Sequence, residues 1–378
     1  FFEKKSNKIK AIKPLYFGMN YDIAIIGSGV IGLSIANELS NINKKIIVID
    51  KEKSFGHHSS TRNSQVIHSG IYYPENSKKA FHCVRGNQMI YNFCELHGIN
   101  YNNTGKIIIA QNDKELKKIK KLKKNGEQNG LNNLKILSEN ELLKIEPNLK
   151  AKYGLFVPST GIFDAHQFMG RLEYLSSNNG VDFLYQYLVT NIDMNNNLIT
   201  VHFENGEKIE CNTLINAAGL WSDKVGNMIQ KDKYKLMYYK GDYYSSSKCK
   251  NIFSHLIYPL PTKLSLGIHA VIDLEGNVGF GPNAYQVSKI DYANNDYHKK
   301  DFYNNIKKYV NIDFEDLKVD FSGIRPKIYC DDKSFQDFNI DYVNNNLINL
   351  VGIESPGLTS SLSIAKEIKE KIKLGISL

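Results

Sequence analysis

The segment GSGVIG, residues 27–32, limits the possible fold of this chain more than any other feature. It matches the pattern G-x-G-x-x-G and follows a short β-branched apolar run, residues 21–26. Residues 30–41 then carry apolar side chains at helical spacing, and a second apolar run ends at Asp50. A strand, a glycine turn, a helix and a parallel strand in this order form the unit that binds dinucleotides. The sequence therefore predicts such a unit near the start of the chain.

Each glycine of the turn has its own task in a dinucleotide-binding unit. Gly27 permits the tight turn, Gly29 lets the backbone approach a pyrophosphate, and Gly32 lets the helix pack closely on the strand. The N-terminus of the helix attracts the anion, and the acid after the second strand accepts hydrogen bonds from ribose hydroxyls. The predicted contacts are Gly27, Ser28, Gly29, Val30, Ile31, Gly32, Asp50 and Lys51.

Alternating strands and helices return at the C-terminal end, where the apolar run 346–352 precedes a helical pattern. Residues 181–189 (VDFLYQYLV) are expected to form one strand, and residues 237–291 several strands separated by Gly and Pro. We expect an α/β fold in which a discontinuous Rossmann-type domain holds an inserted, β-rich α+β substrate domain. The expected boundaries are 19–93, 161–224 and 322–378 for the first domain, 94–160 and 225–321 for the second, and 1–18 for a disordered tail.

Composition argues against several classes of protein. The 378 residues carry a net charge of +9, but 44 of the 48 basic residues are lysine. Arginine, the usual residue for bidentate phosphate and base contacts, is rare, so we expect no nucleic-acid partner. Each arginine is instead a candidate for a position that requires its planar fork. The four are Arg62, Arg85, Arg171 and Arg325.

Cysteine spacing and hydropathy add further limits. The five cysteines are widely spaced and contain no C-x-x-C pair, so we expect no metal site and no disulfide framework, and we favour a reducing compartment. No apolar stretch reaches the roughly 18 residues of a membrane-spanning helix. Residues 113–125 predict a basic helix with a narrow apolar stripe. Such a helix can dock on an anionic membrane, but we favour a solvated face in a chain so rich in lysine.

Six further segments indicate a family. They resemble the FAD-dependent oxidoreductases of the D-amino-acid oxidase superfamily, and within it the L-2-hydroxyglutarate dehydrogenases most. The resemblance extends from about residue 21 to residue 372. The matching segments are NSQVIHSGIYY (63–73), LINAAGLWS (214–222), LGIHA (266–270), GPNA (281–284), SGIRPK (322–327) and LVGIESPGLTSS (350–361).

The resemblance implies FAD as the cofactor, with its pyrophosphate over the glycine turn and its adenosine ribose on Asp50. It implies that the last helix directs its N-terminus at the isoalloxazine, where it would stabilise negative charge on the reduced flavin. Arg62 departs from the residue that is usual at this position in the family. The resemblance leaves open whether Arg62 binds the pyrophosphate or the substrate. The further implied contacts are Ser60, Thr61, Arg62, Asn63, Ser64, Val189, Ala218, Gly219, Gly352, Gly357, Leu358 and Thr359.

The implied reaction is oxidation of a small 2-hydroxy acid to the 2-oxo acid by hydride transfer to flavin N5. Arg325 matches the arginine that binds the substrate carboxylate in amino-acid oxidases of the superfamily, an ordinary salt bridge being the alternative. The hydroxyl proton needs a base, for which His68 and His269 are candidates. We favour His68, because it directly follows the predicted cofactor loop. Lys240 could pair with a distal carboxylate or be solvated.

Two other functions stay open. The first is an amino-acid or glycerol-3-phosphate oxidoreductase. Related glycerol-3-phosphate enzymes have an arginine where this chain has Tyr72, which argues against a phosphate substrate. The second is a catalytically inert FAD-binding module at a membrane. For the enzyme we expect a quinone-type electron acceptor, with a protein or oxygen as alternatives, and a cytoplasmic location, with peripheral contact with the inner face of the membrane as the variant.

Overall fold

The predicted dinucleotide-binding unit is present in the computed structural model, which describes residues 20–195, 198–260, 267–329 and 336–374. Strand β1 (Asn20–Ile26) and strand β2 (Ile46–Asp50) pair in parallel, with helix α1 (Val30–Leu39) between them in the chain. Both strands are buried almost throughout because each of their faces is covered. The expected tail, residues 1–18, lies outside the described residues.

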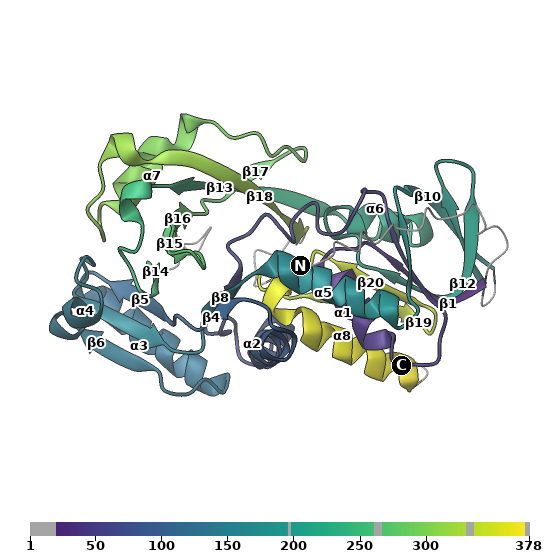
Figure 1. Cartoon of the computed structure of the whole chain (residues 1–378), viewed down its shortest axis with the longest axis horizontal. Coiled ribbons are helices and arrows are strands. Elements are labelled where there is room, and N and C mark those ends of the chain that lie inside the picture. Colours follow the sequence, from purple (N-terminus) through teal and green to yellow (C-terminus); the bar gives the residue numbers. More distant parts are fainter. Residues whose placement is uncertain (1–19, 196–197, 261–266, 330–335, 375–378) are drawn as a thin grey trace, which may run out of the picture.

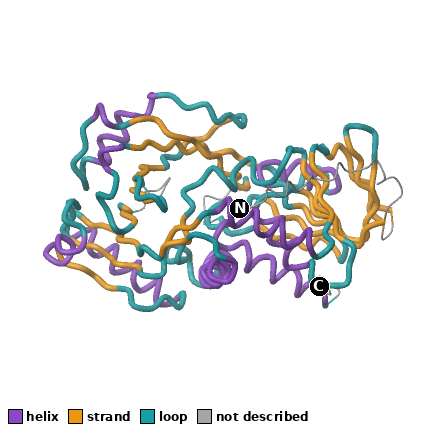
Figure 2. Tube along the Cα trace, viewed as in Figure 1, coloured by secondary structure: helices purple, strands orange, loops and turns teal. Residues whose placement is uncertain are grey.

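Eight strands form the first sheet, in which β12 (Lys208–Asn216) lies beside β1. The first half of β12 pairs with β11 on its other side, and the second half pairs in parallel with β20. Figure 2 shows these strands gathered in one lobe of the molecule. The remaining strands of this sheet are β9 (Asp182–Tyr185), β10 (Val189–Asn195), β11 (Leu198–Phe203), β19 (Asn339–Asn344) and β20 (Leu347–Val351).

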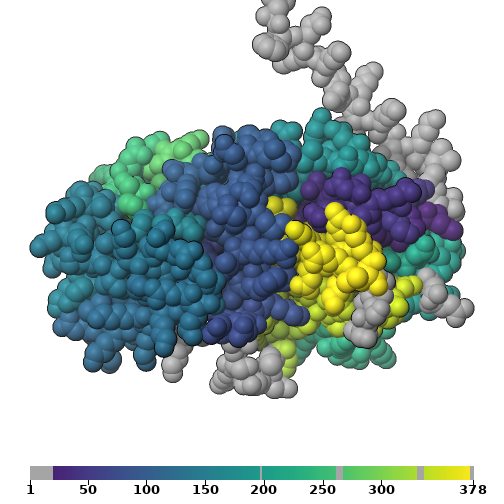
Figure 3. All heavy atoms as spheres, turned by 90° about the horizontal axis from the view of Figure 1, so that it is seen from below, coloured from purple at the N-terminus to yellow at the C-terminus, as the bar shows by residue number. Residues whose placement is uncertain are grey.

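Helices pack beside this sheet and against one another. In Figure 1, α1, α5 (Ala165–Asn178) and α8 (Gly357–Lys373) lie side by side, and α2 (Lys78–His97) lies next to α8, between the two lobes. The second lobe contains a nine-stranded sheet. Seen from below, in Figure 3, the blue surface that includes α2 separates the yellow α8 from this second lobe. The first lobe also contains the short helix α6 (Ser222–Ile229).

The prediction of a single strand over residues 181–189 is wrong. The chain leaves β9 at Gln186, whose φ of 64° lies in the left-handed region, and β10 begins only at Val189. The backbone N–H groups of Gln186 and Tyr187 donate to the carbonyl oxygens of Glu52 and Asp50, at 2.9 and 3.0 Å. The turn therefore closes over the end of β2.

Nine strands form the second sheet, which is mostly antiparallel, as expected. The exception is β14, which pairs in parallel with β5. The expected boundary at residue 322 falls inside β18, whose length pairs with β13 from end to end. The strands are β5 (Lys106–Ala110), β6 (Lys135–Ser138), β7 (Tyr153–Val157), β13 (Leu236–Ser245), β14 (Leu256–Tyr258), β15 (His269–Ile272), β16 (Val278–Gly281), β17 (Tyr285–Val287) and β18 (Lys318–Ile328).

Smaller elements complete the second lobe and the join between the lobes. Helices α4 (Glu139–Ile145) and α7 (Lys299–Ile306) belong to the second lobe. Strands β3 (Val66–Ile67), β4 (Tyr101–Asn102) and β8 (Gly161–Phe163) form a three-stranded sheet between the lobes. The 3₁₀ helices span Gly219–Trp221, Ser247–Cys249, Asp296–His298 and Phe314–Asp316.

The predicted basic helix is α3 (Asp113–Gln128), which packs on β5 and β7. Its apolar stripe is used in this contact: Ile119 is fully buried, and Leu116 and Leu122 join the same core. Its outer face carries six exposed lysines. Among the described helices, none is long and apolar enough to cross a membrane.

Candidate active site

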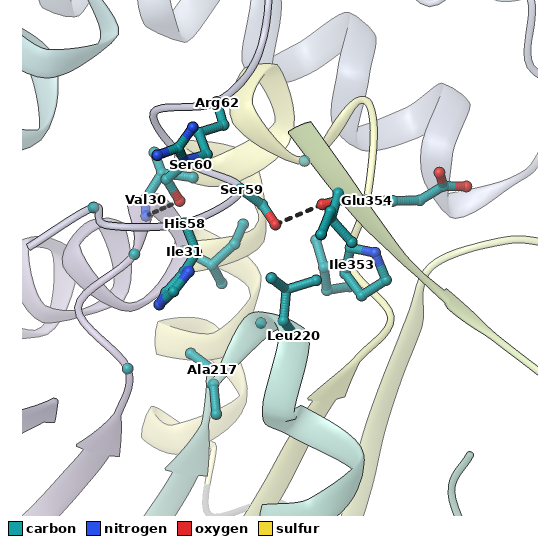
Figure 4. A pocket seen from close by; sticks show the side chains of 18 of the residues that line it. Val30, Ile31, His58, Ser59, Ser60, Arg62, Ala217, Leu220, Ile353 and Glu354 are labelled. Atoms are coloured by element: carbon teal, nitrogen blue, oxygen red, sulfur yellow. Dashed lines mark hydrogen bonds between the residues drawn. The ribbon is translucent and has the colours of Figure 1, made fainter. Parts of the chain in front are cut away.

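A cavity of about 570 Å³ takes its walls from both sheets. The first lobe contributes the glycine turn, the end of β2 and the turn before α8, and the second contributes parts of β13 and β18 together with His269. The loop 56–68 supplies a third wall. Figure 4 shows part of this cavity, with Ala217 and Leu220 on one side and Ser59, Ser60 and Arg62 on the other.

The glycine turn leaves room for a ligand because side chains are missing where the backbone is crowded. Gly27 has a φ of 107°, and a Cβ atom there would lie 2.4 Å from the carbonyl oxygen of Ala217. A Cβ on Gly32 would lie 1.9 Å from the carbonyl oxygen of Gly27. A Cβ on Gly29 would lie 3.0 Å from the Ser60 hydroxyl, which accepts a hydrogen bond from the N–H of Val30. The first turn of α1 thus faces the cavity as a glycine cradle that fits a pyrophosphate.

Asp50 is held in a fixed orientation at the end of β2. One carboxylate oxygen accepts hydrogen bonds from the N–H and the hydroxyl of Ser28, both at 2.7 Å. The other accepts from the N–H of Glu52 at 2.9 Å. Asp50 also lines the cavity, so this carboxylate can accept further hydrogen bonds from a ligand.

A polar and aromatic cluster lies beside Asp50. The Nδ1 atom of His58 shares a hydrogen bond with the Tyr292 hydroxyl at 3.0 Å, and its Nε2 atom shares one with the Glu52 carboxylate at 2.9 Å. The His58 ring also packs edge-on against Trp221. The ammonium of Lys51 lies 3.7 Å from the centre of the Trp221 ring. Burial alone would raise the pKa of Glu52, but the hydrogen bonds from Lys51 and His58 lower it to about 2. The cluster therefore keeps a carboxylate ionised at the cavity wall.

The loop 56–68, which we call the cofactor loop, carries Ser59 and Arg62 and is docked on β18. The Ser59 hydroxyl donates to the carbonyl oxygen of Ile324 at 2.9 Å, a bond visible in Figure 4. A Cβ on Gly323 would lie 2.2 Å from the carbonyl oxygen of Arg62, so the two backbones touch. The guanidinium of Arg62 lies 4.1 Å from the centre of the Tyr292 ring. The cofactor loop is thus held by the second lobe.

An arginine, two histidines and a tyrosine line another part of the cavity: Arg325, His68, His269 and Tyr243. The backbone of His68 is held from two helices, since its N–H donates to the Thr359 hydroxyl at 3.0 Å and its carbonyl accepts from Asn87 at 3.0 Å. Arg325 lies on β18, opposite Tyr239 of β13. These side chains come from distant parts of the sequence and meet because the sheets meet here.

Both histidines are held in the neutral form. Burial lowers the pKa of His68 to about 3, and the positive charges of Lys106 and Arg325 act in the same direction. Burial also lowers the pKa of His269 well below its usual value, again assisted by Arg325. The ring of His269 is stacked on Tyr258, with centroids 4.0 Å apart, and its Nδ1 is 3.1 Å from the carbonyl oxygen of Gly267. That contact fits a proton on Nδ1, which leaves Nε2 as an acceptor.

Most of the predicted site residues line the cavity, and six do not. Thr359 lies behind the wall and holds His68, and Ser28 holds Asp50. Lys240 is buried, and its ammonium donates to the carbonyl oxygen of Ala293. The predicted residues on the wall are Gly27, Gly29, Val30, Ile31, Asp50, Lys51, Ser60, Arg62, Asn63, Ser64, His68, Val189, Ala218, Gly219, His269, Arg325, Gly357 and Leu358, whereas Ser28, Gly32, Thr61, Lys240, Gly352 and Thr359 are not on it.

Several wall residues were missed by sequence reasoning. Trp221 and Glu354 lie inside matched segments, so those segments could have indicated them. In Figure 4 the carboxylate of Glu354 points away from His58 and Arg62, and it pairs with Lys79 at 3.0 Å. Tyr292 is not on the cavity wall but contacts His58 and Arg62 of the loop 56–68; it belongs to no recognised motif and reaches this loop only through the fold. No local sequence pattern could have indicated it.

The fold and the cavity together define a class of protein. A parallel sheet with a glycine turn and a strand-end acid at one part of a cavity, and an arginine with two neutral histidines at another, is the design of a dinucleotide-dependent oxidoreductase. The family model described as FAD dependent oxidoreductase matches residues 22–371, and the chain belongs to this family. FAD is therefore its cofactor, and the enzyme takes a small substrate and passes electrons to an acceptor.

The names of similar proteins point to more than one substrate. The chain is 34% identical to "L-2-hydroxyglutarate dehydrogenase, mitochondrial" from Arabidopsis thaliana, over 93% of this chain and 83% of that protein. It is 30% identical to a glycerol 3-phosphate dehydrogenase from Caloramator mitchellensis, over 93% and 75%. Among solved structures, an L-alpha-glycerophosphate oxidase from Mycoplasma pneumoniae with FAD bound aligns with a TM-score of 0.86 at 24% identity, over 94% of this chain and 95% of that one. At this sequence identity, the similarity to the oxidase shows a shared fold only.

Proposed function

We propose that the protein oxidises a small 2-hydroxy acid of the L-2-hydroxyglutarate type to the corresponding 2-oxo acid. The observation that carries this proposal is the placement of Arg325 on the same cavity as two neutral histidines. An arginine fork suits a carboxylate, and a neutral histidine can accept the proton of a hydroxyl group. The names of several similar proteins support the same substrate class.

Different residues of the cavity would bind different parts of the cofactor and the substrate. The glycine turn and the first turn of α1 would hold the pyrophosphate, and Asp50 would hold the adenosine ribose. Gly357 and Leu358, in the first turn of α8, would place that helix N-terminus against the flavin ring. When bound, FAD supplies the acceptor for the hydride that leaves C2 of the substrate. Arg325 would anchor the substrate carboxylate and so fix which hydrogen faces the flavin.

His68 is our proposed base. Its peptide is fixed by Thr359 of α8 and Asn87 of α2, so its distance from the bound cofactor is set by the same lobe that holds the cofactor. The pKa of His68 in the free protein is low, but an anionic substrate on Arg325 would offset one of the positive charges that lower it. The affinity of His68 for a proton should therefore rise when the substrate binds.

His269 is the second candidate base, and the fixed orientation of its ring supports this alternative. The contact with Gly267 fixes the ring and leaves Nε2 as an acceptor. Anaerobic flavin reduction in His68→Gln and His269→Gln decides between them. Loss of a base should slow reduction by about 10²–10⁴-fold with FAD still bound. We expect that loss for His68→Gln and mainly a higher KM for His269→Gln, and the reverse pattern would assign the base to His269.

A substrate screen tests the function itself. The flavin should lose its yellow absorbance when the protein is mixed without oxygen with L-2-hydroxy acids. It should stay oxidised with the D-enantiomers, with 2-amino acids and with glycerol 3-phosphate. Rapid reduction by glycerol 3-phosphate would favour the rival function that two similar proteins carry in their names. A flavin that no small acid reduces would indicate an inert binding module.

For the electron acceptor we propose a quinone, reached at the surface of a membrane by a protein that otherwise stays in the cytoplasm. The six exposed lysines of α3 support electrostatic contact with anionic lipid, whereas its apolar stripe is used in the core. Steady-state rates with a quinone analogue should exceed those with oxygen. Sedimentation with anionic vesicles at low salt, and not with neutral vesicles, would support the membrane contact. Equal sedimentation with both, or none, would leave α3 a solvated face.

A further inference from the structure

A buried lysine, Lys106, contacts the ring of Tyr258, which is itself stacked on His269. Lys106 begins β5, its side chain is fully buried, and its ammonium lies between two aromatic rings, 4.6 Å from the centre of Tyr72 and 4.8 Å from that of Tyr258. Within the described residues, no carboxylate lies within ion-pair distance of it. Lys79, which is buried almost as deeply, has Glu354 at 3.0 Å. Lys106 is thus a buried amine without a protein counter-ion, and burial lowers its pKa to about 7, so that near neutral pH it exchanges between the ammonium and the free amine.

The two rings that hold this ammonium have unused hydroxyl groups. The phenol oxygens of Tyr72 and Tyr258 are both buried, and neither makes a hydrogen bond in the described part of the chain. Buried polar groups normally find a partner, because leaving one unpaired costs stability. A cation and two free donors gathered at one place have the chemistry of an anion site.

This place is one ring away from the substrate end of the cavity. Tyr258 is stacked on His269, which lines the cavity together with Arg325 and His68. The charge of Lys106 is felt by both histidines, as the direction of their pKa shifts indicates. The lysine side chain is flexible, with three rotatable donors on a four-carbon stem. Lys106, Tyr72 and Tyr258 do not themselves line the cavity, so a ligand would reach them only if the ammonium moves toward His269.

We propose that Lys106 binds the second carboxylate of a dicarboxylic 2-hydroxy acid, and that the hydroxyls of Tyr72 and Tyr258 donate to the same group. This inference rests on the proposed function, since it requires that Arg325 anchors the first carboxylate. The cation–π seat between the rings is then the resting position of the ammonium. An acid with a methyl group in place of the second carboxylate leaves the cation and both hydroxyls unpaired, so the site selects the dicarboxylate.

The test compares two acids of five carbons, L-2-hydroxyglutarate and L-2-hydroxypentanoate, with the wild type and Lys106→Met. The substitution leaves an unbranched apolar side chain that is one atom shorter, and it removes the charge. We expect kcat/KM for the dicarboxylate to fall by about tenfold to hundredfold, the loss of a charge-assisted hydrogen bond. The rate with the monocarboxylate should stay the same or rise. An equal loss with both acids would overturn the proposal, because Lys106 would then act through the histidines or through packing.

Further variants keep the test decisive if Lys106→Met does not fold. Tyr72→Phe and Tyr258→Phe remove one hydroxyl each, and each should weaken only the dicarboxylate. Lys240→Met is a matched control, because it removes another buried lysine, whose ammonium donates to the carbonyl oxygen of Ala293 and does not lie between Tyr72 and Tyr258. It should leave the ratio of the two kcat/KM values unchanged. A ratio that follows Lys240 instead would assign the second carboxylate to that residue.

Binding without turnover gives an independent readout. Glutarate and pentanoate lack the hydroxyl group, so their dissociation constants, measured by the shift of the flavin spectrum, report on carboxylate recognition alone. The wild type should bind glutarate more tightly, and Lys106→Met should lose that advantage. If no 2-hydroxy acid reduces the flavin, the proposed function fails. If both acids reduce it equally well, only the second subsite fails. Selective loss of glycerol 3-phosphate oxidation in Lys106→Met would assign the subsite to phosphate and overturn the carboxylate assignment.

Discussion

At the scale of single residues, the site uses charged groups that the fold isolates from water. Two of the four arginines, Arg62 and Arg325, line the cavity. The other two make peripheral contacts, Arg85 with Glu370 at 4.0 Å and Arg171 with the carbonyl oxygen of His97. In a chain that otherwise uses lysine for positive charge, these two cavity arginines occupy positions where a planar, bidentate donor is useful.

The substitution Arg325→Lys tests the role of the fork. Charge is retained, but an ammonium cannot form two parallel hydrogen bonds with a carboxylate. We expect kcat/KM for the substrate to fall by about tenfold to hundredfold, which corresponds to about 1.5–3 kcal/mol. Flavin content should not change, because Arg325 lies on β18 and not on the dinucleotide unit. Unaltered kinetics would move the carboxylate anchor to Arg62.

Replacing Lys106 should impair catalysis but increase the stability of the protein. A buried cation without a counter-ion costs free energy, so replacing it with an apolar side chain of similar shape should stabilise the protein when no substrate is present. Because burial lowers the pKa of Lys106 to about 7, we expect Lys106→Met to raise the free energy of unfolding by up to about 4 kcal/mol near pH 7, measured by chemical denaturation of the flavin-loaded protein. The control is Lys79→Met, which leaves Glu354 buried and unpaired and should destabilise by about 3–5 kcal/mol. A loss of stability in both variants would make Lys106 a packing residue.

At the scale of elements, the site depends on the contact between a loop and a strand. The cofactor loop touches β18 at Gly323, where the backbone of Arg62 leaves no room for a Cβ. Ser59 adds a hydrogen bond to the next residue of the strand. Because Arg325 lies two residues further along β18, this contact sets the position of the substrate anchor relative to the cofactor loop.

The substitution Gly323→Ala should disturb that contact. Its Cβ would lie 2.2 Å from a backbone oxygen, so the loop must move, at a cost of about 1–3 kcal/mol. We expect weaker FAD binding and a lower kcat, read from the ratio of flavin to protein absorbance and from flavin reduction. Gly279→Ala is the matched control, because a Cβ at that position of β16 meets nothing within 4 Å. Equal effects of the two substitutions would contradict the docking role of Gly323.

The dinucleotide-binding half of the fold could be predicted because its signals are local. The glycine turn, the apolar strands and Asp50 follow one another within about thirty residues, the usual size of such a unit. The strand expected over residues 181–189 could not be divided correctly, because the left-handed turn at Gln186 is stabilised by the carbonyl oxygens of Asp50 and Glu52, at and just beyond the end of β2 and far away in the sequence.

The substrate half of the site was harder to predict, because its residues meet only through the fold. His68 and Arg325 lie in recognisable segments, but Lys106 begins an ordinary buried strand, KIIIA, which carries no motif. Lys240 was a candidate for the distal carboxylate on its sequence position, whereas the structure places its ammonium on the carbonyl of Ala293, away from the cavity wall. Tertiary contacts decide such roles.

At the scale of the whole molecule, stability and function share the same buried histidines. In the unfolded chain a histidine has a pKa of about 6.5, whereas burial lowers that of His68 to about 3 and that of His269 well below normal. Below pH 6.5 the unfolded state therefore binds protons that the folded state does not, and the free energy of unfolding falls as the pH falls.

The expected result is a thermal midpoint that decreases between pH 6.5 and pH 5, in a range above the pKa of most unfolded carboxyl groups. Each histidine contributes up to about 1.4 kcal/mol per pH unit to the free energy of unfolding. The double variant His68→Gln, His269→Gln should show a shallower decrease. Identical slopes for the variant and the wild type would mean that both histidines titrate normally in the folded protein.

Trp221 is the single tryptophan of this chain, and its ring lies in the cavity wall beside Lys51 and His58. Ultraviolet fluorescence of the whole molecule at tryptophan wavelengths therefore comes from one point next to the predicted position of the ribose. Flavins absorb light where tryptophan emits, so energy passes from the ring to a bound isoalloxazine. The flavin-free protein should be bright and the loaded protein dark. The molecule thus carries its own optical label, and the decay of that light would time the entry of the cofactor into a single binding site.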